Sequence, residues 1–475
     1  MDERVDAARQ AALDYHAEPK PGKLEVRATK PLANSRDLSR AYSPGVAEAC
    51  LEIKADPGAT WRYTSRGNLV AVVTNGSAVL GLGNIGAAAA KPVMEGKAVL
   101  FKKFADIDCF DLEVDEPDPE KLAEIIAALE PSFGAINLED VKAPDCFTVE
   151  ALCRARMNIP VFHDDQHGTA IVVAAAALNA LRVAGKRFEE LKVVSTGGGA
   201  AGIACLELLV TMGVRRENVR LCDLHGLVTE GREVDMTPQK AAFAQPGPAG
   251  AGLRDVIEGA DLFLGLSAPG VLTSEDVARM AARPIVFALA NPEPEIRPEA
   301  AREGNPEAIV ATGRSDYPNQ VNNVLCFPFI FRGALDVGAT EVNEAMKVAC
   351  VQAIADLAMQ AGGAEAAAAY AGERLVFGPD YLIPKPFDRR LLPAVAVAVA
   401  KAAMESGVAA RPLDDLDAYR RRLEASVFRS SLVMRPVFEA AAQAHRRIVF
   451  AEGEDERVLR AANALIEETT DRPIL

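Results

Sequence analysis

Short apolar runs alternate with Ala-rich helical segments over most of the chain, and this alternation predicts its secondary structure. Residues 1–66 are more polar, contain several prolines and favour helices and loops. The later apolar runs predict strands at Leu69–Val73, Ala98–Phe101, Ala135–Leu138, Ile159–Phe162, Lys192–Ser195, Val219–Cys222, Leu262–Leu264, Ile285–Ala288 and Ala308–Val310. Strands separated by helices are typical of largely parallel sheets, so we expect an α/β fold. Ligands in such folds bind at the carboxyl ends of the strands.

Breaks in this pattern divide the chain into four expected segments. We expect a first domain over residues 1–160, a second α/β domain over 161–405 and a charged helical linker over 406–429. Residues 430–475 contain an expected strand and turn at Arg447–Gly453 and an expected helix at Asp455–Glu468. One strand and one helix cannot bury their own faces. This segment is therefore expected to be the first fragment of a domain that continues beyond the sequence.

The composition is ordinary for a soluble globular protein, with 49% hydrophobic and 25% charged residues. The net charge of −15 argues against nucleic acid as a partner, because phosphate binding needs a basic surface. The N-terminus lacks the apolar core of a signal peptide, and the longest apolar run, Leu391–Ala400, is too short to span a bilayer. We expect a cytoplasmic protein without a membrane partner. The eight cysteines form no C-x-x-C pair, which favours reduced thiols over disulfides or structural zinc.

Two pairs of acidic residues follow predicted strands. The pair Glu139-Asp140 follows the strand that ends at Leu138, and the pair Asp164-Asp165 follows the strand that ends at Phe162. Isolated acidic pairs are commonly solvated turn residues. Because both pairs end apolar strands in an α/β pattern, the sequence favours a site for Mg²⁺ or Mn²⁺, which prefer oxygen ligands.

Histidines flank the second acidic pair, in the block His163-Asp164-Asp165-Gln166-His167. The spacing is similar to the H-E-x-x-H zinc helix, so a zinc hydrolase is an alternative. The second position is Asp164 instead of Glu, and we expect the block to follow a strand directly, outside an amphipathic helix. The two histidines are therefore expected to be structural.

The G-x-G-x-x-G pattern of dinucleotide-binding turns occurs twice. In the first copy, Gly81–Gly86, Pro92 is expected to interrupt the following helix, although Asp106 lies at about the right distance to bind a ribose. The second copy lies between a predicted strand and an unbroken helical run, and Asp223 ends the next strand. This order matches the full fingerprint. Its residues are Gly197, Gly198, Gly199, Ala200, Ala201 and Gly202.

Three side chains bear on the choice of coenzyme. Asp223 favours NAD, because a carboxylate there repels the 2′-phosphate of NADP. Arg232 and His225 are near enough in sequence to offset this repulsion. The choice between NADP and NAD therefore stays open.

Two further residues are candidates for acid–base chemistry. Lys97 is expected at the start of the strand Ala98–Phe101, where most lysines extend to solvent. Beside a divalent cation, its pKa would be lowered and it could act as a base. Tyr42 precedes the turn residue Pro44, and a simple packing role is the alternative.

Several motifs, in the same order along the chain, together resemble those of the malic enzymes of the compact bacterial type. They are Ala41–Val46, Gly81–Gly86, Glu95–Ala98, Asn137–Asp140, Phe162–Ala170, Phe287–Pro292 and Val321–Val324. The tail from about residue 428 is similar to the start of a phosphate acetyltransferase domain. The resemblance therefore implies a hybrid, multifunctional form, usually NADP-linked, with an N-terminal malic domain followed by a doubly wound, Rossmann-type dinucleotide-binding domain.

The resemblance also implies an activity, oxidative decarboxylation of L-malate to pyruvate and CO₂ with reduction of NADP or NAD. Glu139, Asp140 and Asp165 would ligate Mg²⁺ or Mn²⁺, with Asp164 as a neighbour. Lys97 would take the hydroxyl proton of malate, and Tyr42 would protonate the enolate left by CO₂. The turn Gly197–Gly202 would bind the coenzyme, and Asn291 would lie beside it. Asn323 would contact the substrate. The family further suggests a homodimer or higher homo-oligomer.

One position departs from the family pattern. Animal-type members carry an Arg in the segment that matches Asn75–Val79, where it binds a malate carboxylate, and this chain has Ala78 there. The metal, Asn323 and Ser43 are the candidates for this contact.

Overall fold

The computed structural model describes residues 2–79, 81–248, 250–360 and 375–426, and 447–451, 453–455, 458–459, 462 and 472–474 of the C-terminal segment. Within these residues the first sheet has four parallel strands in the order β2-β1-β3-β4. The strands are β1 (Leu69–Thr74), β2 (Asp108–Glu113), β3 (Ala135–Leu138) and β4 (Val161–His163). The helices between them and after them are α5 (Ala87–Ala105), α6 (Pro119–Ala128), α7 (Asp145–Arg156) and α8 (Asp164–Ala184).

A second sheet of six strands follows, in the order β10-β9-β8-β5-β6-β7. Its strands are β5 (Val193–Thr196), β6 (Val219–Asp223), β7 (Gly226–Leu227), β8 (Leu262–Gly265), β9 (Ile285–Ala288) and β10 (Ile309–Thr312). Only the short β7 runs antiparallel. The chain leaves β5 toward β6 on one side and later continues through β8, β9 and β10 on the other. This reversal confirms the expected doubly wound, Rossmann-type sheet, and places a topological switch point at the end of β5.

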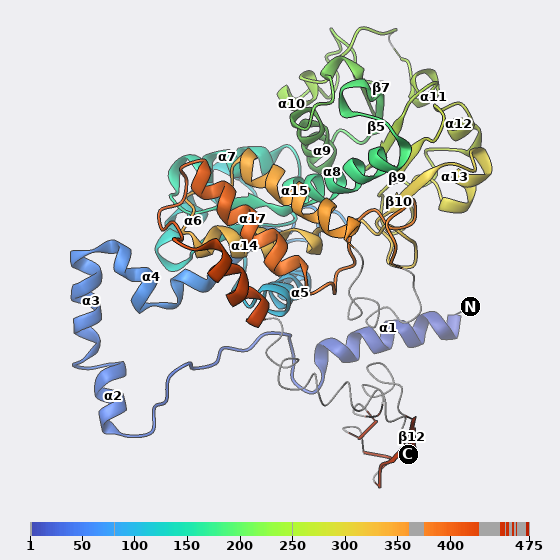
Figure 1. Ribbon diagram of the computed structural model, residues 1–475. Coiled ribbons are helices and arrows are strands. Elements are labelled where there is room, and N and C mark those ends of the chain that lie inside the picture. Colours follow the sequence, from blue (N-terminus) through green and yellow to red (C-terminus); the bar gives the residue numbers. More distant parts are fainter. Residues whose placement is uncertain are drawn as a thin grey trace.

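Short helices connect the strands of the second sheet. They are α9 (Ala200–Thr211), α10 (Pro238–Ala241), α11 (Leu253–Val256), α12 (Ser274–Ala278) and α13 (Pro298–Gly304). Later helices return to the first sheet: α14 (Phe327–Asp336) packs on α5, α15 (Glu344–Met359) packs on α8, and α17 (Leu391–Glu405) packs on both α14 and α15 (Figure 1). Phe101 of α5 contacts the rings of Phe327 and Phe331 at 4.8 and 5.2 Å between centroids. Segments distant in sequence therefore share one core beside the first sheet.

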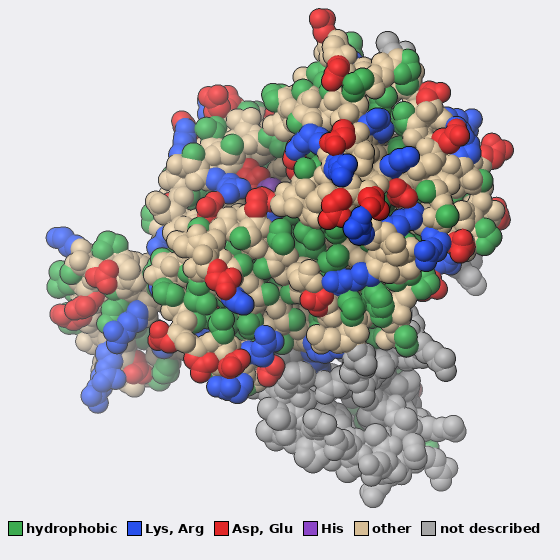
Figure 2. Space-filling view, turned by 45° about the horizontal axis from the view of Figure 1, so that its top comes forward, with side chains coloured by type: hydrophobic (Ala, Val, Ile, Leu, Met, Phe, Trp, Pro, Cys, Tyr) green, Lys and Arg blue, Asp and Glu red, His purple; other side chains and the backbone are tan. Residues whose placement is uncertain are grey.

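Helix α8 is the one described helix that is long and apolar enough to cross a bilayer, and 72% of its most apolar window is buried inside the protein. Burial of this kind is typical of a core helix in a globular protein. The visible face shows acidic and basic side chains interspersed, with no continuous basic patch on its described part (Figure 2).

The N-terminal segment forms an arm beside the two sheets. It comprises α1 (Asp2–Ala17), α2 (Ser35–Ala41), α3 (Val46–Ala55) and α4 (Thr60–Tyr63), and α2 and α3 project from the body (Figure 1). Helices α2, α3 and α4 contain no buried residue. Leu38 and Leu51 are 52% and 58% exposed, which is unusual for leucines on a folded helix.

The predicted strand at Ala98–Phe101 is wrong. This segment lies inside α5, and the helix runs through Pro92 without ending. The buried residues of α5 recur every three or four positions, at Ala87, Ala90, Met94, Ala98, Phe101 and Ala105. The apolar run is one turn of a half-buried helix, and its local hydrophobicity resembles that of a strand.

Strand β2 was not expected, because it carries Asp108, Asp111 and Glu113 and lies at the edge of the sheet. The other strands predicted after residue 66 are confirmed within two residues. The expected strand and turn at Arg447–Gly453 begins with a strand, Arg447–Val449, which pairs in parallel with Arg472–Ile474. Most of the helix expected at Asp455–Glu468 and the end of the expected linker lie outside the described residues.

Candidate active site

The carboxyl ends of β3 and β4 bring the two acidic pairs together. These strands are neighbours, and Leu138 lies opposite His163 in their register, so Glu139 and Asp164 follow adjacent strand ends. Helix α5 crosses this edge and presents Lys97. The Lys97 ammonium donates to Glu139 Oε1 at 2.8 Å and to Asp164 Oδ2 at 2.5 Å. It also lies 4.0 Å from the centre of the Phe327 ring, so a buried cation is enclosed by two carboxylates and an aromatic face.

The charge around Lys97 is unbalanced toward the carboxylates. Burial alone would lower the pKa of Lys97, but Asp164, Glu139 and Asp165 raise it well above its ordinary range. Burial and the neighbouring carboxylates raise the pKa of Glu139 well above its usual value, although Lys97 acts in the opposite direction. A divalent cation was expected to lower the pKa of Lys97. The carboxylates by themselves raise it, because they stabilise the ammonium form.

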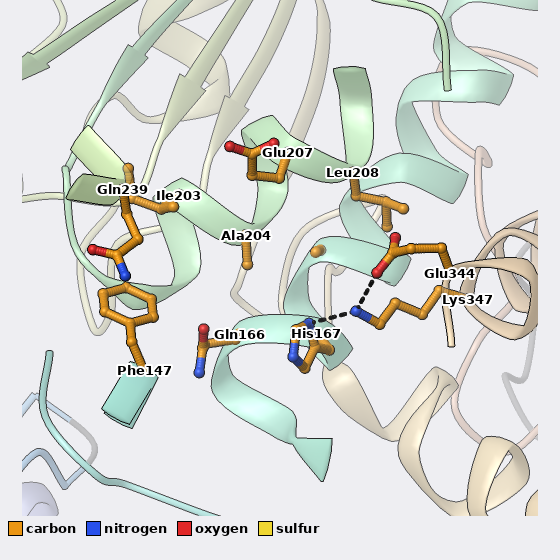
Figure 3. Close-up of a pocket in the computed structure, with 11 residues that line it drawn as sticks. Phe147, Gln166, His167, Ile203, Ala204, Glu207, Leu208, Gln239, Glu344 and Lys347 are labelled. Carbon is orange, nitrogen blue, oxygen red and sulfur yellow. Dashed lines mark hydrogen bonds and ion pairs between the residues drawn. The ribbon is translucent and has the colours of Figure 1, made fainter. Parts of the chain in front are cut away.

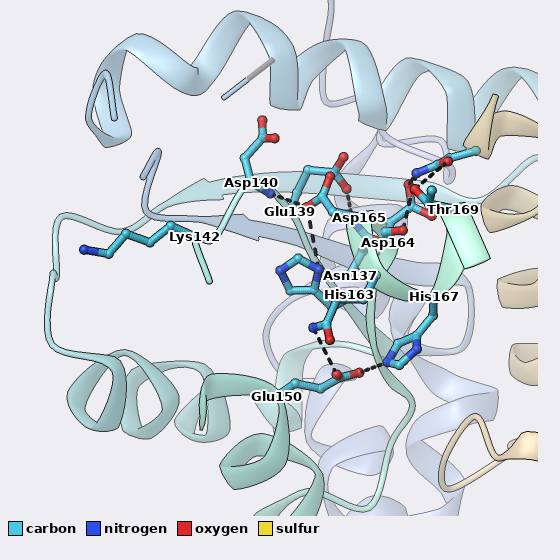
Figure 4. Close-up of polar contacts among 12 residues, drawn as sticks. Asn137, Glu139, Asp140, Lys142, Glu150, His163, Asp164, Asp165, His167 and Thr169 are labelled. Atoms are coloured by element: carbon cyan, nitrogen blue, oxygen red, sulfur yellow. Dashed lines mark hydrogen bonds and ion pairs between the residues drawn. The ribbon is translucent and has the colours of Figure 1, made fainter. Parts of the chain in front are cut away.

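The carboxylates fit a divalent cation by their chemistry. The backbone N–H of Asp140 donates to Asp165 Oδ2 at 2.8 Å, and the Asn137 amide donates to Glu139 Oε2 at 2.8 Å (Figure 4). Asp164 Oδ1 is a buried oxygen without a hydrogen-bond donor. These are hard oxygen ligands with excess negative charge. Among the described residues, however, no three such side chains converge as they stand on one point that could hold an ion.

Asn323 is linked to Lys97 by Asp164, because both side chains hydrogen-bond to the same carboxylate oxygen. It is the first residue of the short 3₁₀ helix Asn323–Leu325. Its amide donates to Asp164 Oδ2 at 3.1 Å, and its amide oxygen accepts from Thr169 at 3.1 Å. The expected substrate contact, Asn323, and the expected base, Lys97, are therefore joined by one carboxylate.

The two histidines of the block face different partners. Helix α8 begins at Asp164, so the block does start a helix, contrary to expectation; acidic residues in a first turn stabilise the positive end of the helix dipole. His163 is fully buried, with Nδ1 3.6 Å from Asp165 Oδ2. His167 Nε2 lies 2.7 Å from Glu150 and its Nδ1 3.1 Å from the Lys347 ammonium. The two histidines therefore have separate partners among the described residues, which does not favour a zinc site built on both.

Glu150 and His167 form a hydrogen-bonded pair behind the acidic pairs. Although burial acts in the opposite direction, His167 lowers the pKa of Glu150 to about 2. His167 and Lys347 also line a pocket of about 210 Å³ between α7, α8, α9 and α15 (Figure 3). This hydrogen bond joins α7 to the first turn of α8, which carries Asp164 and Asp165.

The second glycine copy forms the turn between β5 and α9. Gly197 has φ +104°, and a Cβ there would lie 2.3 Å from the Leu266 carbonyl oxygen. A Cβ at Gly202 would lie 2.0 Å from the Gly197 carbonyl oxygen. Only glycine allows this close path at the switch point of the sheet. The first copy follows β1, and its Gly81 approaches the backbone of Asn291, so both copies border the region between the two sheets.

Asp223 is placed at the end of β6, next to the glycine turn, and two cations bind it. Arg232 donates to both of its oxygens, at 2.9 and 2.5 Å, and Lys240 donates at 3.1 Å. Burial opposes the shift, but these hydrogen bonds and the His225 backbone N–H lower the pKa of Asp223 to about 2. A Cβ at Gly198 would lie 2.7 Å from Lys240 Cε, so Lys240 lies against the turn.

The structure does not bring Tyr42 to this site. Tyr42 ends α2 on the projecting arm, and it is 72% exposed. No described contact joins it to Lys97, and Ser43 is also exposed on the arm. Of the expected site residues, the acidic pairs, Lys97 and Asn323 lie together, whereas Tyr42 lies apart.

Sequence reasoning missed two residues of this site, Phe327 and Lys240, and the role of a third, Asp164. Asp164 was expected only as a neighbour of the metal ligands, yet it makes the shortest contact with Lys97. Phe327 and Lys240 carried no signal, because a single Phe or Lys outside a motif is ordinary. The segment between Asp223 and Lys240 is mostly loop, so their spacing in the sequence does not predict that the two side chains meet.

Models of two known families match most of the chain. Residues 21–154 match the malic enzyme N-terminal domain, and residues 166–368 match the malic enzyme NAD binding domain. Residues 432–475 match the phosphate acetyl/butaryl transferase family, which confirms the expected similarity of the tail.

Individual relatives agree with these matches. An NAD-dependent malic enzyme of Rhizobium meliloti is 62% identical over 98% of this chain and 60% of its own length. An NADP-dependent malic enzyme of Escherichia coli is 59% identical over 99% of this chain and 62% of its own length. The chain thus spans about three fifths of these relatives.

The crystal structure of a malic enzyme from Pyrococcus horikoshii superposes with a TM-score of 0.82, at 41% identity, over 90% of this chain and 98% of that one. Together with the two sheets and the acidic edge between them, these matches show that the chain belongs to the malic enzyme family.

Proposed function

We propose that the protein catalyses the oxidative decarboxylation of L-malate to pyruvate and CO₂, with reduction of NADP and dependence on Mg²⁺ or Mn²⁺. The observation that carries this proposal is Lys97, enclosed by the carboxylates that follow β3 and β4. Relatives named as NADP-dependent malic enzymes support the reaction and the coenzyme. NAD is the alternative coenzyme, because a relative of similar identity is named NAD-dependent.

The chain's own side chains would supply the acid and the base. Lys97 would take the proton of the malate hydroxyl while the hydride passes from C2 to the nicotinamide ring. Loss of CO₂ from the resulting keto acid leaves an enolate, and Tyr42 would donate the proton that converts it to pyruvate. Asn323 would orient the substrate beside Lys97, since both hydrogen-bond to Asp164.

The carboxylates would serve the cation. Glu139, Asp140 and Asp165 would bind it, and Asp164 would remain the partner of Lys97. When bound, the cation would supply a positive charge that offsets the carboxylates and lowers the pKa of Lys97, and a Lewis acid for the substrate oxygens. Asn323 or the cation would bind the malate carboxylate that an Arg binds in animal-type members.

A steady-state assay of NADPH formation from L-malate with Mn²⁺ tests the reaction. We expect turnover that EDTA abolishes and that added Mn²⁺ or Mg²⁺ restores. Absence of turnover with both NADP and NAD would contradict the reaction. Turnover that persists through exhaustive chelation would contradict only the role of the cation.

Lys240 and Arg232 support NADP as the preferred coenzyme. Asp223 would repel a 2′-phosphate, but Arg232 already donates to both of its oxygens and Lys240 donates to one of them. The Lys240 ammonium lies at the border of the glycine turn and could bind the 2′-phosphate as a point charge.

Replacement of Lys240 by alanine is expected to raise KM for NADP by about tenfold or more and to change KM for NAD little, because only NADP carries the phosphate. Steady-state kinetics with both coenzymes at saturating malate measures this split. Lys401→Ala, at an exposed position on α17, is the control and should change neither KM. Equal increases for both coenzymes would contradict the assignment.

We also propose that the protein acts as a homo-oligomer, at least a dimer, in which the arm of one copy completes the site of another. The arm exposes Leu38, Tyr42 and Leu51, and none of its residues in α2–α4 is buried. Exposed apolar side chains of this density favour a protein partner. A second copy would bury the exposed apolar side chains of the arm. The arm would in turn supply Tyr42, the proposed acid, to the site around Lys97 of that copy.

Mixing Tyr42→Phe and Lys97→Ala is the test of this arrangement. Each variant alone is expected to be inactive in malate turnover. After subunit exchange, about a quarter of the wild-type activity should return, because half of the randomly formed dimers hold one intact site. Mixed dimers, verified with two affinity tags, that remain inactive would show that Tyr42 acts only within its own chain.

A further inference from the structure

A fully buried carboxylate, Glu295, connects two loops at the carboxyl edge of the second sheet. Its exposed fraction is 0%. Glu295 Oε1 accepts hydrogen bonds from Ser267 N at 2.8 Å and Ser267 Oγ at 3.4 Å. Its other oxygen, Oε2, accepts from Ala290 N at 3.1 Å. Ser267 lies in the loop after β8 and Ala290 in the loop after β9, so one side chain fixes the separation of these loops.

The same network reaches the glycine turn. The hydroxyl oxygens of Ser267 and Thr196 lie 2.8 Å apart and share a hydrogen bond, and Thr196 directly precedes Gly197. Leu266, the neighbour of Ser267, packs against the turn: a Cβ at Gly197 would lie 2.3 Å from the Leu266 carbonyl oxygen. The ends of β5, β8 and β9 are therefore joined through Glu295.

The fold makes room for this charge and leaves it without a counter-cation. A Cβ at Gly265 would lie 2.4 Å from Glu295 Cδ, so glycine is required opposite the carboxylate. No ion pair among the described residues includes Glu295, which is bound by N–H and O–H donors alone. Burial of an unpaired carboxylate is costly, and burial raises the pKa of Glu295. A neutral apolar contact would join the loops at a lower cost, so stability alone does not account for the charge.

We propose that Glu295 is a positioning residue for the dinucleotide. It fixes the loops after β8 and β9 relative to the turn after β5, so that Gly197 on one side and Asn291, the neighbour of Ala290, on the other border the coenzyme at a fixed separation. This inference rests on the proposed function. Glu295 has no described contact with Lys97, Asn323 or the acidic pairs, so its effect is confined to the coenzyme.

Glu295→Gln tests the proposal, because glutamine keeps the shape but places an NH₂ group where one oxygen accepts. We expect the Kd of NADPH, measured by fluorescence titration without malate, to rise about tenfold to a hundredfold, the range of a lost hydrogen bond to a charged group. At saturating NADP, KM for malate and kcat should change less than about twofold, since the reacting groups are untouched. The matched control is Glu293→Gln, two residues away, where the carboxylate pairs with Arg297 and Arg314 at the surface.

A second variant, Ser267→Ala, removes the hydroxyl links and keeps the backbone donor, and its Kd for NADPH should rise by a smaller factor. A lower Tm of Glu295→Gln with an unchanged Kd would overturn the proposal and leave a purely structural role. If Glu295→Gln does not fold, an unchanged Kd in Ser267→Ala overturns it. Absence of NADPH binding by the wild type would instead contradict the proposed function, which separates the two failures.

Discussion

Lys97→Ala is expected to abolish the proposed malate oxidation, with kcat/KM falling by about a thousandfold or more. The Lys97 ammonium is the one cation that any described contact places against Glu139 and Asp164. Lys102, on the same helix, is not positioned to replace it, because it pairs with Asp106 and Asp108 at the surface. The variant therefore loses the proposed base and the group that orders the two carboxylates.

The same substitution is expected to lower stability in a manner that depends on the metal. Removing one partner of a buried ion pair leaves the other charges uncompensated, at a cost of about 3 kcal/mol. Mn²⁺ should restore Tm more strongly in Lys97→Ala than in the wild type, because the carboxylates then lack any other cation. Restored stability without restored turnover separates the chemical role from a folding defect.

Steady-state kinetics and thermal unfolding with and without Mn²⁺ measure both effects. Lys102→Ala, five residues later on the same helix and about half exposed, is the control and should retain activity within about twofold. Full malate turnover by Lys97→Ala would show that the base is another group.

The sequence predicted most strands of both sheets because parallel strands are buried on both faces and appear as short, continuous apolar runs. The rule predicted a strand wrongly at Ala98–Phe101 in α5, because one turn of a half-buried helix is as apolar as a strand. Strand β2 failed it for the opposite reason: as an edge strand it carries charged side chains on a partly exposed face. Periodicity over a longer window identifies α5, whereas nothing local identifies β2.

The acidic pairs could be predicted to meet, because the carboxyl ends of parallel strands lie along one edge of a sheet. The way their partners reach them could not. Lys97 was a candidate base, but it was expected at the start of a strand and comes instead from helix α5, and Phe327 comes from a helix that returns after the second sheet. The position of Tyr42 on an exposed arm could not be predicted either. A Tyr-Ser-Pro-Gly turn specifies only local backbone geometry and does not indicate which surface the turn packs against.

Gly168→Ala is expected to reduce kcat/KM by about a hundredfold although it replaces no titratable residue. Gly168 lies one turn after Asp164 on α8, and a Cβ there would lie 1.9 Å from Asp164 Oδ1 and 2.8 Å from its Cγ. Asp164 is fully buried, so its carboxylate must rotate away from Lys97 and Asn323. Helix propensity alone favours alanine over glycine by about 1 kcal/mol, so a loss of activity cannot arise from a weaker helix.

The control for Gly168→Ala is Gly96→Ala, in the interior of α5 and adjacent to Lys97. A Cβ at Gly96 would meet only the Lys23 ammonium, at an ordinary 3.8 Å, so this variant should keep its activity and gain up to about 1 kcal/mol of stability. Kinetics at 25 °C, together with the Tm of both variants, separates rotation of Asp164 from a general effect of a glycine replacement. If Gly168→Ala were as active as Gly96→Ala, the Asp164–Lys97 contact would not be required for turnover, and the base would have to be oriented by Glu139 alone.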